Sequence, residues 1–279
     1  MLAAVVPVAV GVGLSWRLTG NVEWLLAVCT LTSATAIQIA TNFFNDAIDF
    51  TKGTDTGERL GPQRVTQSGL FSPRQVIIAG LVMAVVAVLL SLPMVAARGW
   101  PVVAIGLPSL YFAYGYTGGP LPLAYRGLGD LFVVLFFGFV AVIGTVFVQT
   151  GNWFAEAVLA GLQVGMLSTV LIAVNNLRDI DGDRVSGKRT LAVRFGQGMA
   201  RWEITLLCLL PHVAGVAWVL WKQWNGAFLL PLIAVLPGVV VASGVWRHPP
   251  GSVYNKFLGI AAAQLLLFAL GFIGACCLG

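Results

Sequence analysis

One apolar segment of this chain ends in the sequence NFFNDAID, residues 42–49, and a second ends in NNLRDIDGD, residues 175–183. Six of the eleven acidic residues in the chain lie within residues 42–55 and 175–183, and Lys and Arg residues follow each stretch. Carboxylates at the edge of a membrane-spanning segment are costly and usually functional. We name the two stretches acidic motif 1 (residues 42–55) and acidic motif 2 (residues 175–189). Together they indicate a site for a divalent metal and a phosphorylated substrate.

The composition is that of a membrane protein. Hydrophobic residues make up 58% of the 279 positions, charged residues only 10%, and the mean hydropathy is +0.89. Apolar runs of spanning length recur along the chain, so we predict an all-α, polytopic membrane protein. The four cysteines lie in apolar runs and match no metal-ligand spacing. We expect one transmembrane domain over residues 1–279, without a disulfide framework or a cleaved signal peptide.

Nine transmembrane helices are expected from the apolar runs. Pro101 and Pro108 fall within one short run, which we expect to be tilted or broken. The approximate limits of the nine helices are 1–16, 24–45, 74–97, 101–116, 129–149, 153–174, 202–221, 226–245 and 255–277.

The basic residues predict the orientation of these helices. Nine helices place thirteen of the sixteen basic residues on the side that carries both acidic motifs, and only Arg17, Arg98 and Lys222 on the other. The positive-inside rule puts the richer side, with both motifs and the N-terminus, in the cytoplasm. This topology accounts for the net charge of +5 without a nucleic-acid partner.

The spacing within the motifs predicts that they share one cavity. Asn42 and Asp46 are four residues apart, as are Asn175 and Asp179, so each pair lies on one face of its helix. The motifs end the second and sixth predicted helices, and an offset of four helices preserves the helix direction. Two such helices packed side by side would direct both sets of carboxylates into the same space.

The motifs also suggest a chemistry. Both lie at the C-terminal ends of helices, where the macrodipole is negative, so the carboxylates repel one another unless a cation neutralises them. Mg²⁺ prefers such oxygen ligands and leaves positions for substrate phosphates. The basic residues that follow, Lys52, Arg64, Lys188 and Arg189, could hold a diphosphate and make it a good leaving group. Any single Asp could equally cap a helix, and any of these cations could be a membrane anchor; the matched pair of motifs favours the metal site.

Three tyrosines approach the end of the fourth predicted helix: Tyr111, Tyr114 and Tyr116. Aromatic faces stabilise cations, although tyrosines at a membrane interface also form an ordinary aromatic belt. Both roles stay open on the sequence.

These motifs resemble those of the UbiA superfamily of intramembrane aromatic prenyltransferases. The resemblance covers nearly the whole chain, and the segment from Tyr116 to Asp130 is similar to the branch that prenylates 1,4-dihydroxy-2-naphthoate in menaquinone synthesis. The stretches that carry it are Asn45-Asp46-x-x-Asp49, Gly61-Pro-Gln-Arg64, Asn175-Asn176-Leu-Arg178-Asp179-x-Asp181-x-Asp183 and Lys188-Arg189-Thr-Leu-Ala.

The resemblance implies a nine-helix bundle around a central cavity that opens to the cytoplasm, in the plasma membrane of a prokaryote. Mg²⁺ would bridge both motifs to a polyprenyl diphosphate. Diphosphate would leave, and the naphthoate would attack the allylic cation and lose carbon dioxide to give demethylmenaquinone. Carried over by position, the metal ligands are Asn42, Asp46, Asp49, Asp179 and Asp183, the four Asp residues being catalytic. The diphosphate would contact Lys52, Arg64, Lys188 and Arg189, and the prenyl cation or aromatic ring would face Tyr114 and Tyr116.

Alternatives remain open on the sequence. The acceptor could be 4-hydroxybenzoate or homogentisate, and neither the prenyl length nor the oligomeric state is determined. Relatives carry an Arg-Pro-rich segment before the first helix, whereas Met1 lies within that helix here. This departure leaves the acceptor end of the site less well defined than the diphosphate end. A membrane transporter would place its ionisable residues near the bilayer midplane, and a CDP-alcohol transferase would carry an Asp-Gly-x-x-Ala-Arg signature that Asp181-Gly182-Asp183-Arg184 does not supply.

Overall fold

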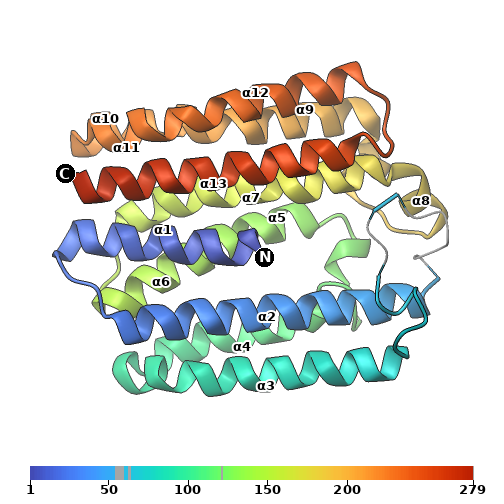
Figure 1. Cartoon of the computed structure of the whole chain (residues 1–279), viewed down its shortest axis with the longest axis horizontal. Helices are drawn as coiled ribbons and strands as arrows, with labels where there is room; N and C mark the ends of the chain where they lie inside the picture. The colour runs from blue at the N-terminus through green and yellow to red at the C-terminus, as the bar shows by residue number, and fades with distance from the viewer. Residues whose placement is uncertain (54–59, 62–63, 121, 279) are drawn as a thin grey trace.

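The computed structural model describes residues 1–53, 60–61, 64–120 and 122–278, and every regular element in these ranges is helical. The long helices lie side by side in one bundle (Figure 1). They are α1 (Leu2–Thr19), α2 (Trp24–Thr51), α3 (Pro73–Arg98), α4 (Trp100–Gly115), α7 (Ala155–Arg178), α9 (Leu191–Ala214), α12 (Val235–Arg247) and α13 (Tyr254–Leu278). The shorter pieces are η1 (Leu123–Tyr125), α5 (Gly129–Val133), η2 (Val134–Val140), α6 (Ala141–Thr150), α8 (Ile180–Val185), α10 (Val216–Lys222), α11 (Asn225–Leu229) and η3 (Leu230–Ala234).

Eight helical segments within the described ranges are long and apolar enough to cross a membrane. Five are single helices (α1, α2, α3, α7 and α13), and three combine consecutive pieces over residues 129–150, 191–222 and 225–247. Helix α4 is a ninth helical segment in the bundle, but its 16 residues rise only about 24 Å. This is less than the ~30 Å thickness of a bilayer core. The predicted all-α membrane protein is confirmed, while the ninth full span is not. Pro108 lies inside a continuous α4, so that segment is not broken.

Two boundaries differ most from the predicted ones. Helix α2 continues to Thr51, so acidic motif 1 is helical through Asp49 rather than past the helix end. The segment α9 begins at Leu191, but the non-helical backbone of Gly196 (φ +83°, ψ 172°) interrupts it, so a short first piece precedes the long helix, which still starts before the predicted residue 202. Its first turns are amphipathic and contain Arg194 and Arg201, so hydropathy does not detect them, whereas the Thr190 side chain caps the helix by accepting a bond from the Val193 N–H at 3.3 Å.

A close helix contact holds the wall of the site together. A Cβ atom added to Gly165 of α7 would lie 2.8 Å from the Val134 carbonyl oxygen of η2. Only glycine therefore allows α7 to approach the π-helical segment η2 so closely. The contact sets α5 beside the end of α7, where the Asn176 amide donates to Asp130 Oδ1 at 3.5 Å.

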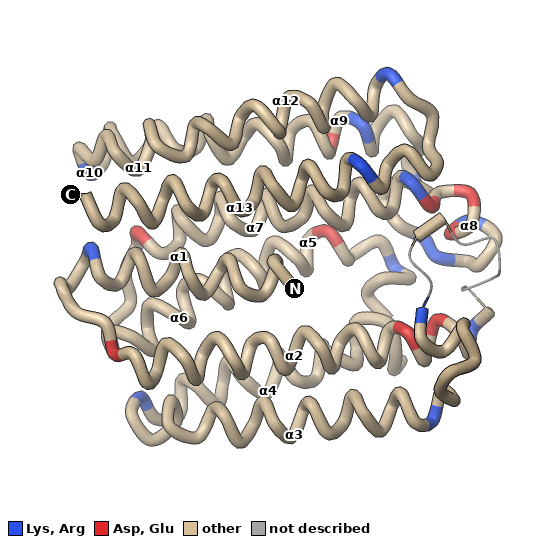
Figure 2. Tube along the Cα trace, viewed as in Figure 1, with Lys and Arg blue, Asp and Glu red and all other residues tan. Residues whose placement is uncertain are grey.

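Most of the charged residues lie toward one end of the bundle and a few at the other, while acidic residues on α5 and α9 lie between the two ends (Figure 2). The more highly charged end contains the last turns of α2 and α7, all of α8 and the first turn of α9 (Figure 1). The two acidic motifs, far apart in sequence, therefore lie at the same end of the molecule.

Candidate active site

A polar cavity of about 460 Å³ lies between the two acidic motifs. Acidic motif 1 contributes Asn45 and Asp49 to its lining. Acidic motif 2 contributes Asn175, Asn176, Arg178, Asp179, Asp181, Gly182, Asp183 and Lys188. The predicted convergence of both motifs on one cavity is therefore what the structure shows.

Asp49 joins the two motifs. Its side chain is buried, with 2% of its surface exposed. Oδ2 accepts bonds from Arg64 at 2.9 Å and from Lys188 at 3.2 Å, and Oδ1 accepts one from the Tyr125 hydroxyl at 2.9 Å. A carboxylate of α2 thus holds two cations, one of them from acidic motif 2, at the edge of the polar cavity.

Arg178 fixes the other wall. It is buried and donates to both oxygens of Asp179, at 2.8 and 2.6 Å. It also donates to Asn175 Oδ1 at 2.7 Å and to Asn255 Oδ1 at 2.7 Å. A buried guanidinium is tolerated when its donors are satisfied in this way. Arg178 therefore positions Asp179 and Asn175.

Asp183 lies on α8, facing the same cavity. Burial raises the pKa of its carboxyl to about 7; Lys188 opposes this shift, and the charges of Asp179 and Asp49 add to it. The carboxylates of the two motifs are thus close enough to repel one another. Added positive charge in the cavity would relieve this repulsion.

The donor set suits a divalent ion that arrives together with phosphate. Hard oxygen donors face the cavity from both walls, on Asn45, Asp49, Asp179 and Asp183. Across the described residues, no three acidic, histidine or cysteine side chains form a cluster that could hold a metal ion without other ligands. Arg64, Lys188 and Arg178 hold the carboxylates in ion pairs. Mg²⁺ commonly takes only one or two carboxylates and completes its shell with water and phosphate oxygens. The residues therefore fit this ion.

Two residues expected to bind the metal lie elsewhere. Asn42 is exposed, does not line the polar cavity and accepts a bond from the Gln38 amide at 3.1 Å. Asp46 is buried and accepts the backbone N–H groups of Val65 and Thr66 at 3.0 and 3.3 Å. Asp46 thus anchors the turn that carries Arg64. Asp55 of acidic motif 1 lies outside the described residues.

The predicted diphosphate ligands also separate. Arg64 and Lys188 line the polar cavity. Lys52 does not; its ammonium donates to the Thr117 carbonyl at 2.8 Å and lies 4.0 Å from the centre of the Tyr125 ring. Burial lowers the pKa of Lys52, and nearby Asp49 opposes that shift. Arg189 lines a different groove.

The sequence prediction missed four residues at this site: Asn45, Tyr125, Asp130 and Arg178. Asn45 is four residues before Asp49, the same spacing as in the predicted Asn42–Asp46 pair. Its Oδ1 accepts a bond from the Thr117 hydroxyl. Asp130 is buried and lines the cavity, and its signal was a lone carboxylate in an otherwise apolar segment.

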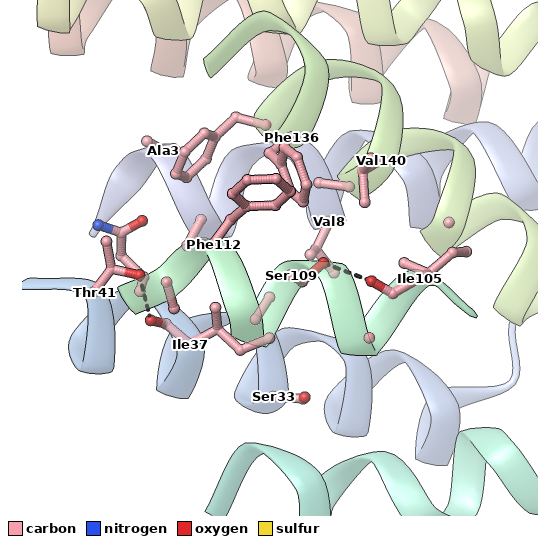
Figure 3. A pocket seen from close by; sticks show the side chains of 18 of the residues that line it. Ala3, Val8, Ser33, Ile37, Thr41, Ile105, Ser109, Phe112, Phe136 and Val140 are labelled. Atoms are coloured by element: carbon pink, nitrogen blue, oxygen red, sulfur yellow. Dashed lines mark hydrogen bonds between the residues drawn. The ribbon is translucent and has the colours of Figure 1, made fainter. Parts of the chain in front are cut away.

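An apolar cavity of about 370 Å³ adjoins the polar one. The two share the lining residues Asn45, Tyr116 and Ile172. Phe112 of α4 and Phe136 of η2 face each other inside it, with ring centres 5.5 Å apart (Figure 3). Tyr116 therefore lies at the junction of the two cavities, whereas Tyr114 is exposed and packs edge-on against Phe44 at 5.7 Å.

The sequence profile described as the UbiA prenyltransferase family matches residues 4–269. This chain belongs to the UbiA prenyltransferase family. It is 32% identical over 276 residues to a 1,4-dihydroxy-2-naphthoate octaprenyltransferase of Mycobacterium tuberculosis, covering 99% of this chain and 93% of the relative. It is 34% identical over 227 residues to the protein of the same name from Bacillus subtilis, covering 81% and 71%.

Solved UbiA structures share the fold. A UbiA homologue from Aeropyrum pernix, in the apo state, superposes with a TM-score of 0.76 at 16% identity, covering 98% of this chain and 97% of that one. A UbiA homologue from Archaeoglobus fulgidus, bound to DMAPP and Mg²⁺, superposes with a TM-score of 0.65 at 14% identity, covering 97% and 95%. The helical bundle described above is thus the UbiA fold.

Proposed function

We propose that this chain transfers a polyprenyl group from polyprenyl diphosphate to 1,4-dihydroxy-2-naphthoate, with loss of carbon dioxide. The observation that carries the proposal is the pair of adjoining cavities, one charged and one apolar, that meet at Tyr116. A prenyl diphosphate has the same two parts, a charged head and an apolar tail. The relatives named for this naphthoate reaction, at 32–35% identity, favour it over 4-hydroxybenzoate or homogentisate.

The charged cavity binds the diphosphate. Arg64 and Lys188 are directed into it and supply donors for phosphate oxygens. Asn45, Asp49, Asp179 and Asp183 would hold Mg²⁺, which neutralises the charge that develops on the leaving diphosphate. Asp49 keeps Arg64 and Lys188 in place at 2.9 and 3.2 Å, so these cations are already positioned when the substrate enters.

The junction receives the reacting carbon. The C–O bond to diphosphate breaks with its electron pair on oxygen, and the new C–C bond forms to the ring carbon that carries the carboxylate. Carbon dioxide then leaves, and its bonding pair restores the aromatic ring. The faces of Tyr116, Phe112 and Phe136 line the apolar side of this junction, where they exclude water and stabilise an allylic cation.

Asp130 is placed to orient the acceptor. It lines the polar cavity close to the junction, and a Cβ on the neighbouring Gly129 would lie 2.9 Å from the Tyr116 hydroxyl. A carboxylate at this point can accept a hydrogen bond from a ring hydroxyl of the naphthoate.

The topology follows the positive-inside rule. The basic-rich end of the bundle, with the polar cavity, faces the cytoplasm of a prokaryote, and α4 completes nine spans by virtue of its position among longer helices. The prenyl tail then occupies the apolar cavity at membrane depth. The diphosphate is taken up from and released to the cytoplasmic side.

Prenyl transfer by the purified protein tests this function. The protein is given geranylgeranyl diphosphate with each of the three acceptors, with Mg²⁺ or with a chelator, and products are identified by mass spectrometry. We expect a decarboxylated product from the naphthoate alone, only with metal. Asp49→Asn is expected to lower turnover by about 10²–10³-fold, whereas Glu23→Gln, at a side chain that is 45% exposed at the opposite end of the bundle, is expected to stay within about twofold of wild type. Equal activity of the two variants would contradict the assignment.

A further inference from the structure

Three arginines line a separate groove beside the polar cavity. This groove, of about 600 Å³, is bordered by Arg126, Arg189 and Arg194. It shares no lining residue with the polar cavity or with the apolar one. We call it the arginine groove.

Two segments distant in sequence build the arginine groove. The Arg189 N–H donates to the Tyr125 carbonyl at 3.3 Å, and Arg194 Nε donates to the Arg189 carbonyl at 3.1 Å. Gly127 makes the approach possible, because its φ is +70° and a Cβ there would lie 2.6 Å from the Arg189 carbonyl. The backbone of the groove is thus built by the packing of the two segments, and the three arginine side chains on it are exposed.

The same two segments separate the groove from the polar cavity. Along the chain their residues alternate between the two spaces: Gly127 and Lys188 face the polar cavity, while Arg126 and Arg189 face the groove. Tyr125 crosses this wall, since its hydroxyl donates to Asp49 and its ring lines the groove. The groove therefore lies one side-chain layer away from the proposed diphosphate site.

The groove carries positive charge that no acidic group among the described residues balances. No described residue forms an ion pair with any of the three arginines, and none of the described lining residues is acidic. By contrast, Arg64, Arg98 and Arg178 each pair with a carboxylate. The three guanidinium groups are exposed, so solvent screens part of their repulsion. Their shared positive charge still favours an anion among them, and guanidinium matches phosphate in geometry as well as charge.

We propose that the arginine groove is a second anion site, which binds a phosphate group directly and without metal. This assignment goes beyond the proposed catalytic activity and does not depend on it. The phosphate can come from the headgroup of an anionic phospholipid or from free inorganic diphosphate. Both would be recognised by the same bidentate guanidinium contacts.

Two binding measurements on the full-length protein in chelator distinguish the two sources. In the first, inorganic diphosphate is titrated into detergent-purified protein by calorimetry. In the second, native mass spectrometry counts the phosphatidylglycerol molecules retained after extraction from nanodiscs of phosphatidylglycerol and phosphatidylcholine. The groove variant is Arg126→Gln/Arg194→Gln. The matched control is Arg74→Gln/Arg247→Gln, which removes the same charge from the same end of the bundle, away from the groove.

We expect the groove variant to bind one of the two anions at least about tenfold more weakly than wild type, with the control unchanged. A further variant, Arg126→Lys/Arg194→Lys, is expected to recover part of the binding, which a purely structural role for these residues would not produce. The proposal is wrong if groove and control variants bind both anions alike. Metal-dependent turnover plays no part in this readout, so its failure would leave the proposed catalytic function standing.

Discussion

At the scale of single residues, the site depends on the ion pairs that organise its carboxylates before any ligand binds. Asp49 holds Arg64 and Lys188, and Arg178 holds Asp179. Arg178 is buried and donates to Asp179, Asn175 and Asn255, so we expect its role to be positional. Lys188 faces the polar cavity and has only one carboxylate partner among the described residues, so it can turn its remaining donors to a diphosphate.

Lys188→Ala tests this difference. Loss of a charged donor to phosphate should raise the KM for prenyl diphosphate by roughly 10–100-fold, with a smaller effect on the KM for the aromatic acceptor. Initial-rate kinetics with each substrate varied in turn make the comparison, and Lys188→Arg, which keeps the charge, should restore much of the loss. A similar rise in both KM values would argue against a diphosphate role.

Asp183 predicts a pH dependence. Burial raises the pKa of its carboxyl to about 7, so in the metal-free protein the group is largely protonated at pH 6 and ionised at pH 8. A proton competes with a divalent ion for this carboxylate. The Mg²⁺ concentration that gives half-maximal rate should therefore be roughly tenfold higher at pH 6 than at pH 8. If the Mg²⁺ concentration for half-maximal rate is the same at pH 6 and pH 8, Asp183 is not a metal ligand.

At the scale of helices, residue spacing identified acidic motif 1 but not the face that it presents. Asn42–Asp46 and Asn45–Asp49 are both four residues apart, so helical periodicity alone cannot choose between them. Packing decides: Phe44 lies against Gly80 of α3, where an added Cβ would be 2.7 Å from its ring. This contact turns Asn45 and Asp49 toward the cavity and leaves Asp46 to anchor the turn after α2. Sequence patterns could not predict which face of α2 points into the cavity, because that depends on its packing against α3.

The contact between α7 and η2 gives a prediction at the same scale. Gly165→Ala would place a methyl group 2.8 Å from the Val134 carbonyl, and such overpacking costs about 1–3 kcal/mol. We expect a lower melting temperature in detergent and reduced turnover, because α5 and Asp130 shift with η2. Gly198→Ala on α9 is the control, since a Cβ there meets nothing within 4 Å. Unchanged stability of the Gly165 variant would show that the two helices are not tightly constrained.

At the scale of the whole molecule, the sequence predicted the membrane bundle and the grouping of its charges. Figure 2 shows most charged residues gathered toward the two ends of the bundle. At the end opposite the polar cavity, Arg98 pairs with Glu23 at 2.7 Å and Lys222 with Glu156 at 2.6 Å. The apolar cavity could not be predicted in this way, because the residues that line it come from many helices and have no period of their own.

The central claim is that one substrate spans both cavities across Tyr116. The most direct measurement is an experimental structure of the protein with Mg²⁺ and geranylgeranyl S-thiolodiphosphate, a donor analogue whose diphosphate does not leave. We expect the diphosphate between Asp49 and Asp183, in contact with Arg64 and Lys188, and the tail passing Tyr116 into the space between Phe112 and Phe136. A diphosphate bound outside the polar cavity, or a tail outside the apolar one, would contradict the account.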